Sequence, residues 1–595
     1  MNVLLEPLKY YEQIAKHAHE QNLKEYFNSL VKSSAINVAE NRKTAALFRK
    51  KDKIAENTKN KINKLKGWRV FLIILSALGV VALILGQTLG EGTAMLITAL
   101  SSVAVIAICL LVIFLSLNKK IKNFENLYAV QREKADNVRR EAERQMQPLN
   151  AAFTEKTTLS LIEKVMPGLK FQDDFSFELF DDFNRNYAFI NDIDKNRSVF
   201  NTVSGRYNEN PFVFYRYINH YMGTKTYFGT KVISWRATVR GSDGKRRTVT
   251  KTQTLHASVI KPYPLYTCAT ALNYGNQTAP DLNFSRKGNH AEDWSESKLE
   301  RKIKSGAKKI DDMAEQAVID GKDFTEMANS EFDVLFNALD RTHEVQFRVM
   351  FSPLAQVNMV KLMRSNTGYG DDFSFIKRGK HNYIISEHAQ KWNMDTSPAN
   401  YYSYDVDIAE KNFISFNNEY FKSVYFDLAP LLSIPAYHEK PSLTFEPINY
   451  NERNYSDYEY EVMANAIGAR FFAHPKSRTE VILKAKHISS INGTDVVEIG
   501  AYSFTEANRV DFIPVFGGDG RMHNVPVPWI EYIPVYNSTF IVIKRMGMDS
   551  QQFENKTKGL SDLFDTPSAF YHGLFAKILG NNDASIFESA LEKIK

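Results

Sequence analysis

Two uncharged apolar runs dominate the hydrophobic pattern. They cover Val70 to Gly86 and Ala94 to Leu117. A helix needs about 20 apolar residues to cross the hydrocarbon core of a bilayer, with ~17 as the lower limit. Trp68 supplies an interfacial anchor just before the first run. Soluble core helices rarely stay apolar on all sides for this length, so the alternative of two buried core helices is disfavoured. The pattern predicts a two-helix transmembrane hairpin over residues 68–117.

The charges that flank this hairpin predict its orientation. Residues 50–69 contain eight Lys and Arg, residues 118–136 contain five, and the loop Gln87–Thr93 contains none. Because Lys and Arg collect on the cytoplasmic side, we expect a multi-pass protein of the cell membrane with two spans and both termini in the cytoplasm. The spans hold no ionisable group except the thiol of Cys109, which argues against an ion path through this hairpin alone.

Helical patterns continue on both sides of the spans. Residues 1–67 read as an N-terminal helical region and a first stalk helix, with Leu8, Tyr11, Ile14 and Ala18 spaced for one helical face. That helix either packs on itself or the main body, or lies on the lipid surface. Residues 118–154 read as a second stalk helix, antiparallel to the first. Its seam alternates steps of three and four, as in a coiled coil: Ile121, Phe124, Tyr128, Gln131, Ala135, Val138, Ala142, Gln145 and Leu149. The alternative is two solvated helices without stable pairing.

From residue 155 the pattern becomes a large α+β body rich in antiparallel sheet, with a first lobe at 155–395 and a second lobe at 396–595. Alternation over 231–260 around Asp243-Gly244 predicts a β-hairpin. We further expect a helix at 293–318, a strand at 343–351, a helix that starts at Ser352-Pro353, and a hairpin at 372–386. In the second lobe we expect helices near 408–431 and 456–473, a β-rich segment at 479–545 and a helical tail. The GSDGK and GGDGR turns leave an internal duplication open.

Three segments carry a family resemblance: EYFNSLVKSSAINVAENRKTA, the two-span hairpin, and HEVQFRVMFSPLAQVNMVKLM with FSFIKRGKHNYIIS. They resemble a family of two-span membrane proteins of Gram-positive bacteria that is known only as a domain of unknown function. The likeness covers about half of the chain. It implies a bacterial membrane anchor with a cytoplasmic α+β body, and it assigns no active-site residues.

Composition and motifs narrow the chemistry without naming a reaction. The formal net charge of +7 over 595 residues is mild, and the two cysteines, Cys109 and Cys268, are not expected to pair. The sequence has no GxxxxGK[ST] loop, no HExxH and no CxxC, so it predicts no cofactor and no metal site. We expect no catalytic residues from local patterns, although a site assembled from distant residues would leave none.

Three smaller patterns have simpler explanations than a site. His17 and His19 point apart on a helix, which favours surface histidines over a metal pair. The DIDKN stretch at 192–196 begins like a calcium loop, but Arg197 and Val203 stand where glycine and glutamate are needed. The acidic residues between 173 and 182 alternate with phenylalanines, which indicates an amphipathic element with a solvated face.

The most suggestive cluster is basic and lies on the 231–260 hairpin. A hairpin of this kind binds phosphates of nucleic acid or of anionic lipid headgroups, or it only protects a strand edge. Our leading hypothesis is a non-enzymatic, membrane-anchored scaffold or binding protein of the bacterial envelope with a cytoplasmic protein partner; homo-oligomerisation stays open. The alternative is a membrane-tethered enzyme or effector that acts on nucleic acid or anionic lipid through the cluster. Its members are Arg236, Arg240, Lys245, Arg246, Arg247 and Lys251.

Overall fold

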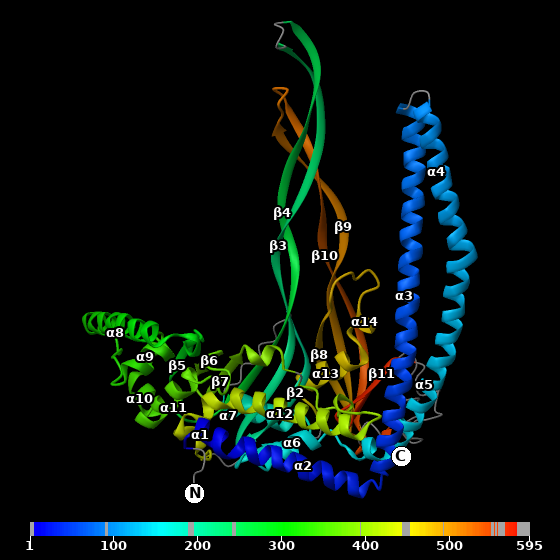
Figure 1. Ribbon diagram of the computed structural model, residues 1–595. Coiled ribbons are helices and arrows are strands. Elements are labelled where there is room, and N and C mark those ends of the chain that lie inside the picture. The colour runs from blue at the N-terminus through cyan, green and yellow to red at the C-terminus, as the bar shows by residue number, and fades with distance from the viewer. Residues whose placement is uncertain are drawn as a thin grey trace. The chain divides into compact units, whose positions relative to one another are not determined.

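The computed structural model confirms an α+β protein with antiparallel sheets and a helical N-terminal region (Figure 1). It describes residues 5–89, 93–187, 196–240, 245–392, 394–442, 453–491, 493–548, 552–553, 556 and 566–579. The chain divides into two compact units. The first comprises 1–22, 155–396 and 417–595, and the second comprises 23–154 and 397–416.

Long helices make up the second unit. α2 (Lys16–Ser33) ends at a turn in which Ala35 has a φ of 51°, and α3 (Val38–Leu89) then runs for 52 residues. α4 (Thr93–Val112), the π-turn η2 (Ile113–Leu117) and α5 (Asn118–Ala152) form one continuous helical path back. Two helices, over Val38–Leu85 and Ala99–Ala152, are long and apolar enough to span a membrane. Helix therefore continues from span into stalk on both sides, as the sequence predicts.

The stalk helices α3 and α5 pack against each other in antiparallel order (Figure 1). Every position of the predicted seam on α5 is buried or half-buried. Polar pairs set the register: Thr58 Oγ1 donates to Gln131 Oε1 over 2.7 Å, and Arg132 lies 2.6 Å from Asp52. The alternative of unpaired solvated helices is wrong, because these side chains lie where only a packed pair would place them.

Residues 397–416 belong to this same unit and fix the lower end of the stalk. Asn41 is fully buried on α3; its Nδ2 donates to Tyr404 O over 3.0 Å and its Oδ1 accepts from Val406 N over 3.0 Å. Arg49 lies 2.5 Å from the buried carboxylate of Asp405. A short segment far along the sequence thereby satisfies groups that would otherwise stay unpaired in the helix pair.

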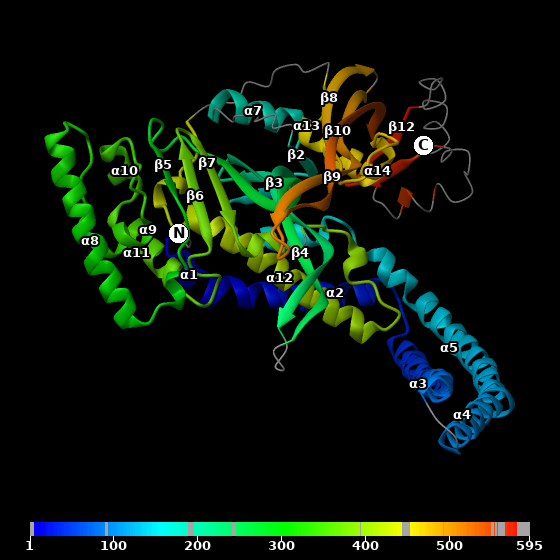
Figure 2. The same cartoon turned by 90° about the horizontal axis from the view of Figure 1, so that it is seen from above.

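The first unit holds a seven-stranded antiparallel sheet in the order β1-β2-β3-β4-β7-β6-β5. Helices α8 to α11 lie towards its β5 edge (Figure 2). The elements are β1 (Leu169–Phe171), β2 (Arg197–Tyr207), β3 (Asn210–Arg240), β4 (Arg246–Gly275), β5 (Asn283–Arg286), β6 (Phe373–Arg378), β7 (His381–Ser386), α6 (Thr157–Glu163), α7 (Phe177–Tyr187), α8 (Glu296–Ile319), α9 (Ser330–Phe336), α10 (Glu344–Met350), α11 (Pro353–Arg364) and α12 (Val406–Leu432), whose residues from Asn417 belong to this unit.

A second sheet of five strands has the order β11-β12-β10-β9-β8 and packs on helix α13. Its elements are β8 (Ile482–Ile491), β9 (Thr494–Phe516), β10 (Met522–Arg545), β11 (Ser568–Tyr571), β12 (Leu574–Ile578), α13 (Asp457–Ile467) and α14 (Ala469–Phe472). The predicted helical tail is wrong at 568–578, where the chain forms the edge strand β11 and its neighbour β12. Most other tail residues lie outside the described part of the chain.

The strand predicted at 343–351 is also wrong, because Glu344–Met350 is the helix α10. The alternation of Val345, Phe347, Val349 and Phe351 is accidental. Val345 and Val349 are exposed, whereas Phe347 and Phe351 stack one helical turn apart with ring centroids 4.7 Å apart. The helix then ends and α11 begins at the predicted Ser352-Pro353 signal, with Ser352 accepting from Ala355 N. The buried phenylalanines are four positions apart, as on one face of a helix, and the spacing of two that a strand would need does not match the burial.

The N-terminal residues pack on the main body, which is one of the predicted alternatives, and they correct the prediction for His19. α1 (Pro7–Tyr10) and the π-turn η1 (Tyr11–Ala15) pack within the first unit, where Tyr11 contacts Tyr425 and Phe426 at 4.8 Å. His19 is fully buried and stacks on Phe421, so its assignment as a surface histidine is wrong; His17 is exposed. The wide π-turn moves the buried face to Tyr11, Ala15 and His19, and Ile14 becomes half-exposed.

Two buried carboxylates on α13 tie the two sheets together. Glu459 accepts from Phe175 N over 2.8 Å and from Thr202 Oγ1 over 2.6 Å on the side of the first sheet. Glu461 accepts from Val199 N over 2.8 Å and lies 2.5 Å from Lys484 Nζ of β8. Burial raises the pKa of Glu461 to about 7, although Lys484 opposes the shift. The α13 helix therefore bridges the sheets through charge as well as through apolar contact.

We predict that Lys484→Met destabilises the protein by about 3 kcal/mol at pH 8, because it leaves the Glu461 carboxylate buried without its cation. The loss shrinks at pH 5.5, since a carboxyl with a raised pKa binds its proton there and the neutral form suits burial. Thermal unfolding at both pH values measures this. Lys486→Met, at an exposed position of the same strand, is the control. An equal loss at both pH values would contradict the role of Glu461.

Candidate binding arm and basic tip

Two long β-ribbons leave the sheets of the first unit. The first ribbon is β3 paired with β4, and the second is β9 paired with β10. β3 continues for about twenty residues past its pairing with β2, which at ~3.3 Å per residue is a reach of about 65 Å. The ribbons wind around each other, and the first extends further than the second (Figure 1). We call the wound pair the arm.

The inner face of each ribbon carries odd-numbered residues and packs on the other ribbon. Ile233 and Leu255 of the first ribbon form a small core with Val525 of the second, and Trp235 and Val515 pack against it. Lys261 lies 2.7 Å from Asp511 and 4.3 Å from the centre of the Trp529 ring. Apolar burial and one shared ion pair thereby hold the ribbons together.

Glycine permits the closest approach between the ribbons. A Cβ on Gly229 would lie 2.0 Å from Pro526 O, so only glycine fits against that backbone. Near the end of the second ribbon, Gly518 N donates to Gln253 Oε1 over 2.7 Å. The contact at Trp235 and Gln253 marks the point where the first ribbon continues beyond the second.

Prolines occupy one edge of β10. Pro526, Pro528 and Pro534 share strand parity, so they remove the N–H donors of a single edge. β10 pairs with β9 on its other side, and β12 covers only Ile541–Arg545 of the proline-bearing edge. The carbonyl of Asn524 on this edge accepts from Lys231 Nζ over 3.2 Å.

All six predicted basic residues lie where the first ribbon has passed the second. Their side chains are exposed, and they are distributed over both faces. Arg236, Arg240 and Arg246 share the outer face, because Arg240 pairs with Arg246 and Arg236 with Thr250. Lys245, Arg247 and Lys251 lie on the other face or at the turn. The Asp243-Gly244 turn lies outside the described residues. We call these six residues the basic tip.

The two ribbons carry net charges of opposite sign. Between 221 and 262 the first ribbon has nine Lys and Arg and one acidic residue, Asp243. Between 505 and 533 the second has two Arg and four acidic residues. The ribbons therefore attract each other along their length, while the extending tip is strongly positive.

A polar cluster that sequence reasoning missed surrounds His388. His388 Nδ1 lies 2.7 Å from Asp372, its Nε2 lies 3.5 Å from Asp427, and Tyr369 stacks on the ring at 3.8 Å. The two carboxylates raise the pKa of His388 against the opposing effect of its burial. These residues come from three distant segments, so no local spacing could have revealed them.

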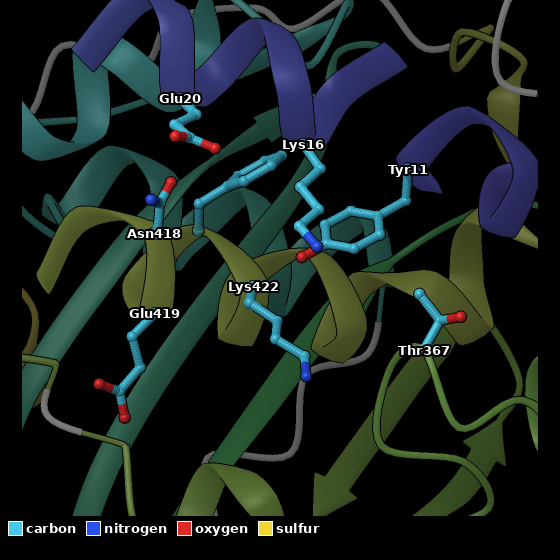
Figure 3. Close-up of a pocket in the computed structure, with 8 residues that line it drawn as sticks. Tyr11, Lys16, Glu20, Thr367, Asn418, Glu419 and Lys422 are labelled. Carbon is cyan, nitrogen blue, oxygen red and sulfur yellow. The ribbon is translucent and has the colours of Figure 1, made fainter. Parts of the chain in front are cut away.

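A shallow pocket of about 260 Å³ lies beside this cluster (Figure 3). Lys16, Glu20, Glu419 and Lys422 contribute its charges, and Lys422 Nζ lies 4.4 Å above the Tyr369 ring. Two ammonium and two carboxylate groups nearly balance, so the pocket favours no charge of ligand. His290, Glu292 and Asp293 also approach one another closely enough for a metal ion, but Glu292 already accepts from Asp371 N. Neither the pocket nor the group of His290, Glu292 and Asp293 extends from the sheets as the arm does.

The acidic segment near 173–182 behaves largely as predicted. It forms the amphipathic helix α7, with Leu179, Phe180 and Phe183 buried. Three acids depart from the solvated face: Asp182 is buried and lies 2.8 Å from Arg206, and the side chains of Asp174 and Asp181 are largely covered and paired with arginines. The aspartates of the calcium-like stretch, 192 and 194, lie outside the described residues.

Comparison with known proteins supplies no function. No family model, no curated protein and no solved structure matches the chain. The resemblance to two-span membrane proteins of Gram-positive bacteria therefore stays a prediction, and the functional argument rests on the geometry of the arm.

We predict that Gly229→Val separates the ribbons, because its side chain meets the Pro526 carbonyl. Hydrogen exchange of the amides at 228–236 and 513–526 should accelerate at least about tenfold, since paired ribbons protect what an isolated ribbon exposes. Thr230→Val, on the outer face one residue away, is the matched control. Unchanged exchange in Gly229→Val would show that the contact does not hold the arm together.

Proposed function

We propose that the protein is a non-enzymatic, membrane-anchored binding protein of the bacterial envelope whose arm is the element that contacts its partner. The observation that supports this most is the arm itself. The first ribbon extends about 65 Å, and the two ribbons together present a long surface whose inner side is packed. Surfaces of this kind suit macromolecular partners.

Exposed apolar side chains on the outer faces support a protein partner. Large apolar groups gathered on an exposed surface commonly mark an interaction site. Most of those on the arm have even residue numbers, the parity opposite to the packed seam: Met222, Phe228, Val232, Ile260, Val510, Phe512, Phe516 and Met522; the odd-numbered Tyr221, Val249 and Ile533 are exposed as well. Phe228 is 73% exposed and Val232 is 69% exposed.

The membrane part of the proposal rests on the two apolar helices and on the charges that flank them. Thirteen Lys and Arg in the two flanks, against none in the loop Gln87–Thr93, favour cytoplasmic termini and a cytoplasmic body. The arm would then meet a cytoplasmic partner.

Topology is tested with single cysteines. In a background with Cys109→Ala and Cys268→Ser, a Thr88→Cys variant should react with a membrane-impermeant maleimide on intact cells. In a separate Cys109→Ala variant, the native Cys268, which is exposed on β4, should react only after the cells are opened. Labelling of Cys268 but not of residue 88 in intact cells would invert the proposed orientation.

The partner is tested by photo-crosslinking in living cells. A photoreactive amino acid at Val232 or at Phe512 should give the same discrete adduct. The same amino acid at Val318, which is 75% exposed at the end of α8, should not. Gly229→Val should reduce the adduct at both arm positions, because the partner meets both ribbons together. Equal adducts at Val318 would contradict a role for the arm.

A further inference from the structure

The basic tip carries positive charge on both faces of the first ribbon. Three arginines, Arg236, Arg240 and Arg246, lie on the outer face, and Arg247 and Lys251 lie on the opposite face beyond the second ribbon. A ligand that neutralises all of them must therefore offer negative charge on more than one side. A flat lipid surface meets one face of a ribbon, whereas a nucleic-acid groove places a wall of phosphates on each side.

The outer face next to these arginines is built for phosphate oxygens. The register places hydroxyl groups opposite and between the guanidinium groups: Thr238 pairs with Thr248, Ser234 with Thr252 and Arg236 with Thr250. All these residues are exposed. Arginine forks and hydroxyl donors are the groups that contact the nucleic-acid backbone without reading its sequence.

Large apolar side chains are missing from the tip. Between 236 and 251 the described residues include only Ala237, Val239 and Val249 as apolar groups. A hairpin that enters a bilayer carries aromatic or large aliphatic residues at its end, because these gain most from leaving water. The apolar outer residues Phe228, Val232 and Ile260 lie behind the tip, not at its end.

We propose that the basic tip binds the phosphate backbone of double-stranded nucleic acid, with the ribbon lying in a groove and without sequence specificity. A two-stranded ribbon fits the major groove of B-DNA. The inference rests on the proposed function in one respect, because both take the arm as the contact element. It adds a ligand class at the tip that is separate from the protein partner expected along the apolar outer faces.

The test uses the full chain in nanodiscs of zwitterionic lipid and a fluorescent 30-base-pair duplex of random sequence. Anisotropy should show binding at low salt, and a plot of log affinity against log salt should have a slope of about −4, since each neutralised phosphate contributes close to −0.9. The variant R236E/R240E/R246E/R247E should bind at least about a hundredfold more weakly. Its thermal midpoint should stay unchanged, because all four side chains are exposed.

A matched control carries the same change of charge elsewhere. Arg301, Lys304, Lys308 and Lys309 are exposed on α8, and reversing all four should leave duplex binding within about twofold. Duplex binding that survives the tip variant, or that falls equally in the α8 variant, would overturn the proposal.

Vesicles separate the two sources of phosphate. Vesicles of phosphatidylglycerol and phosphatidylcholine should bind the protein at least about tenfold more weakly per phosphate than the duplex does, because one face of the tip meets them. Equal or tighter vesicle binding that the tip variant abolishes would assign the tip to lipid and overturn nucleic acid. Failure of the crosslinks at Val232 and Phe512 with intact duplex binding would instead count only against the protein partner.

Discussion

The contact between Gly229 and the backbone at Pro526 is the constraint on which the arm depends. A two-stranded ribbon alone is at best marginally stable in water, because it has no second layer on which to bury a face. Here each ribbon supplies the second layer for the other, and the small core of Ile233, Leu255 and Val525 becomes possible only at glycine distance. The basic tip extends from a ribbon that this seam supports.

The two sheets at the base of the arm are held in place relative to each other by charged side chains of α13. Apolar contacts have no preferred direction, so they alone would let the two sheets shift against each other. The buried carboxylates of Glu459 and Glu461, in contrast, need specific donor groups on both sides. Phe175 N, Thr202 and Val199 N belong to the first sheet side, and Lys484 belongs to the second. The bridge fixes the relative register of the sheets, and therefore the place from which both ribbons start.

Local patterns in the sequence were sufficient for the two long apolar helices, the stalk seam and the first hairpin. Each depends on spacing within one segment, such as Ile121 to Leu149 along α5 or Ile233 to Val239 along β3. The strand predicted at 343–351 failed because its buried set, Glu344, Phe347 and Phe351, fits a helix as well as the alternation fits a strand. His19 was misplaced because a π-turn rotated the helix by part of a turn, which no propensity scale signals.

The arm and the His388 cluster could not be predicted, since both join residues from separate segments: nearly three hundred positions apart at Gly229 and Pro526, and tens of positions apart around His388. Nothing near Gly229 indicates Pro526, and nothing near His388 indicates Asp427. The six basic residues lie together at the end of the first ribbon, but their distribution over both of its faces could be seen only in the structure. Only the end of the second ribbon at Gly518 shows that the cluster begins where support from the partner ribbon stops.

The prolines of β10 have a consequence for how such an arm survives at high concentration. A long exposed edge normally offers a ladder of donors and acceptors on which another chain can polymerise. Pro526, Pro528 and Pro534 remove three N–H donors along one such edge, which disfavours the addition of a strand from a second molecule there. Where backbone donors are missing, an approaching molecule meets the arm through its side chains.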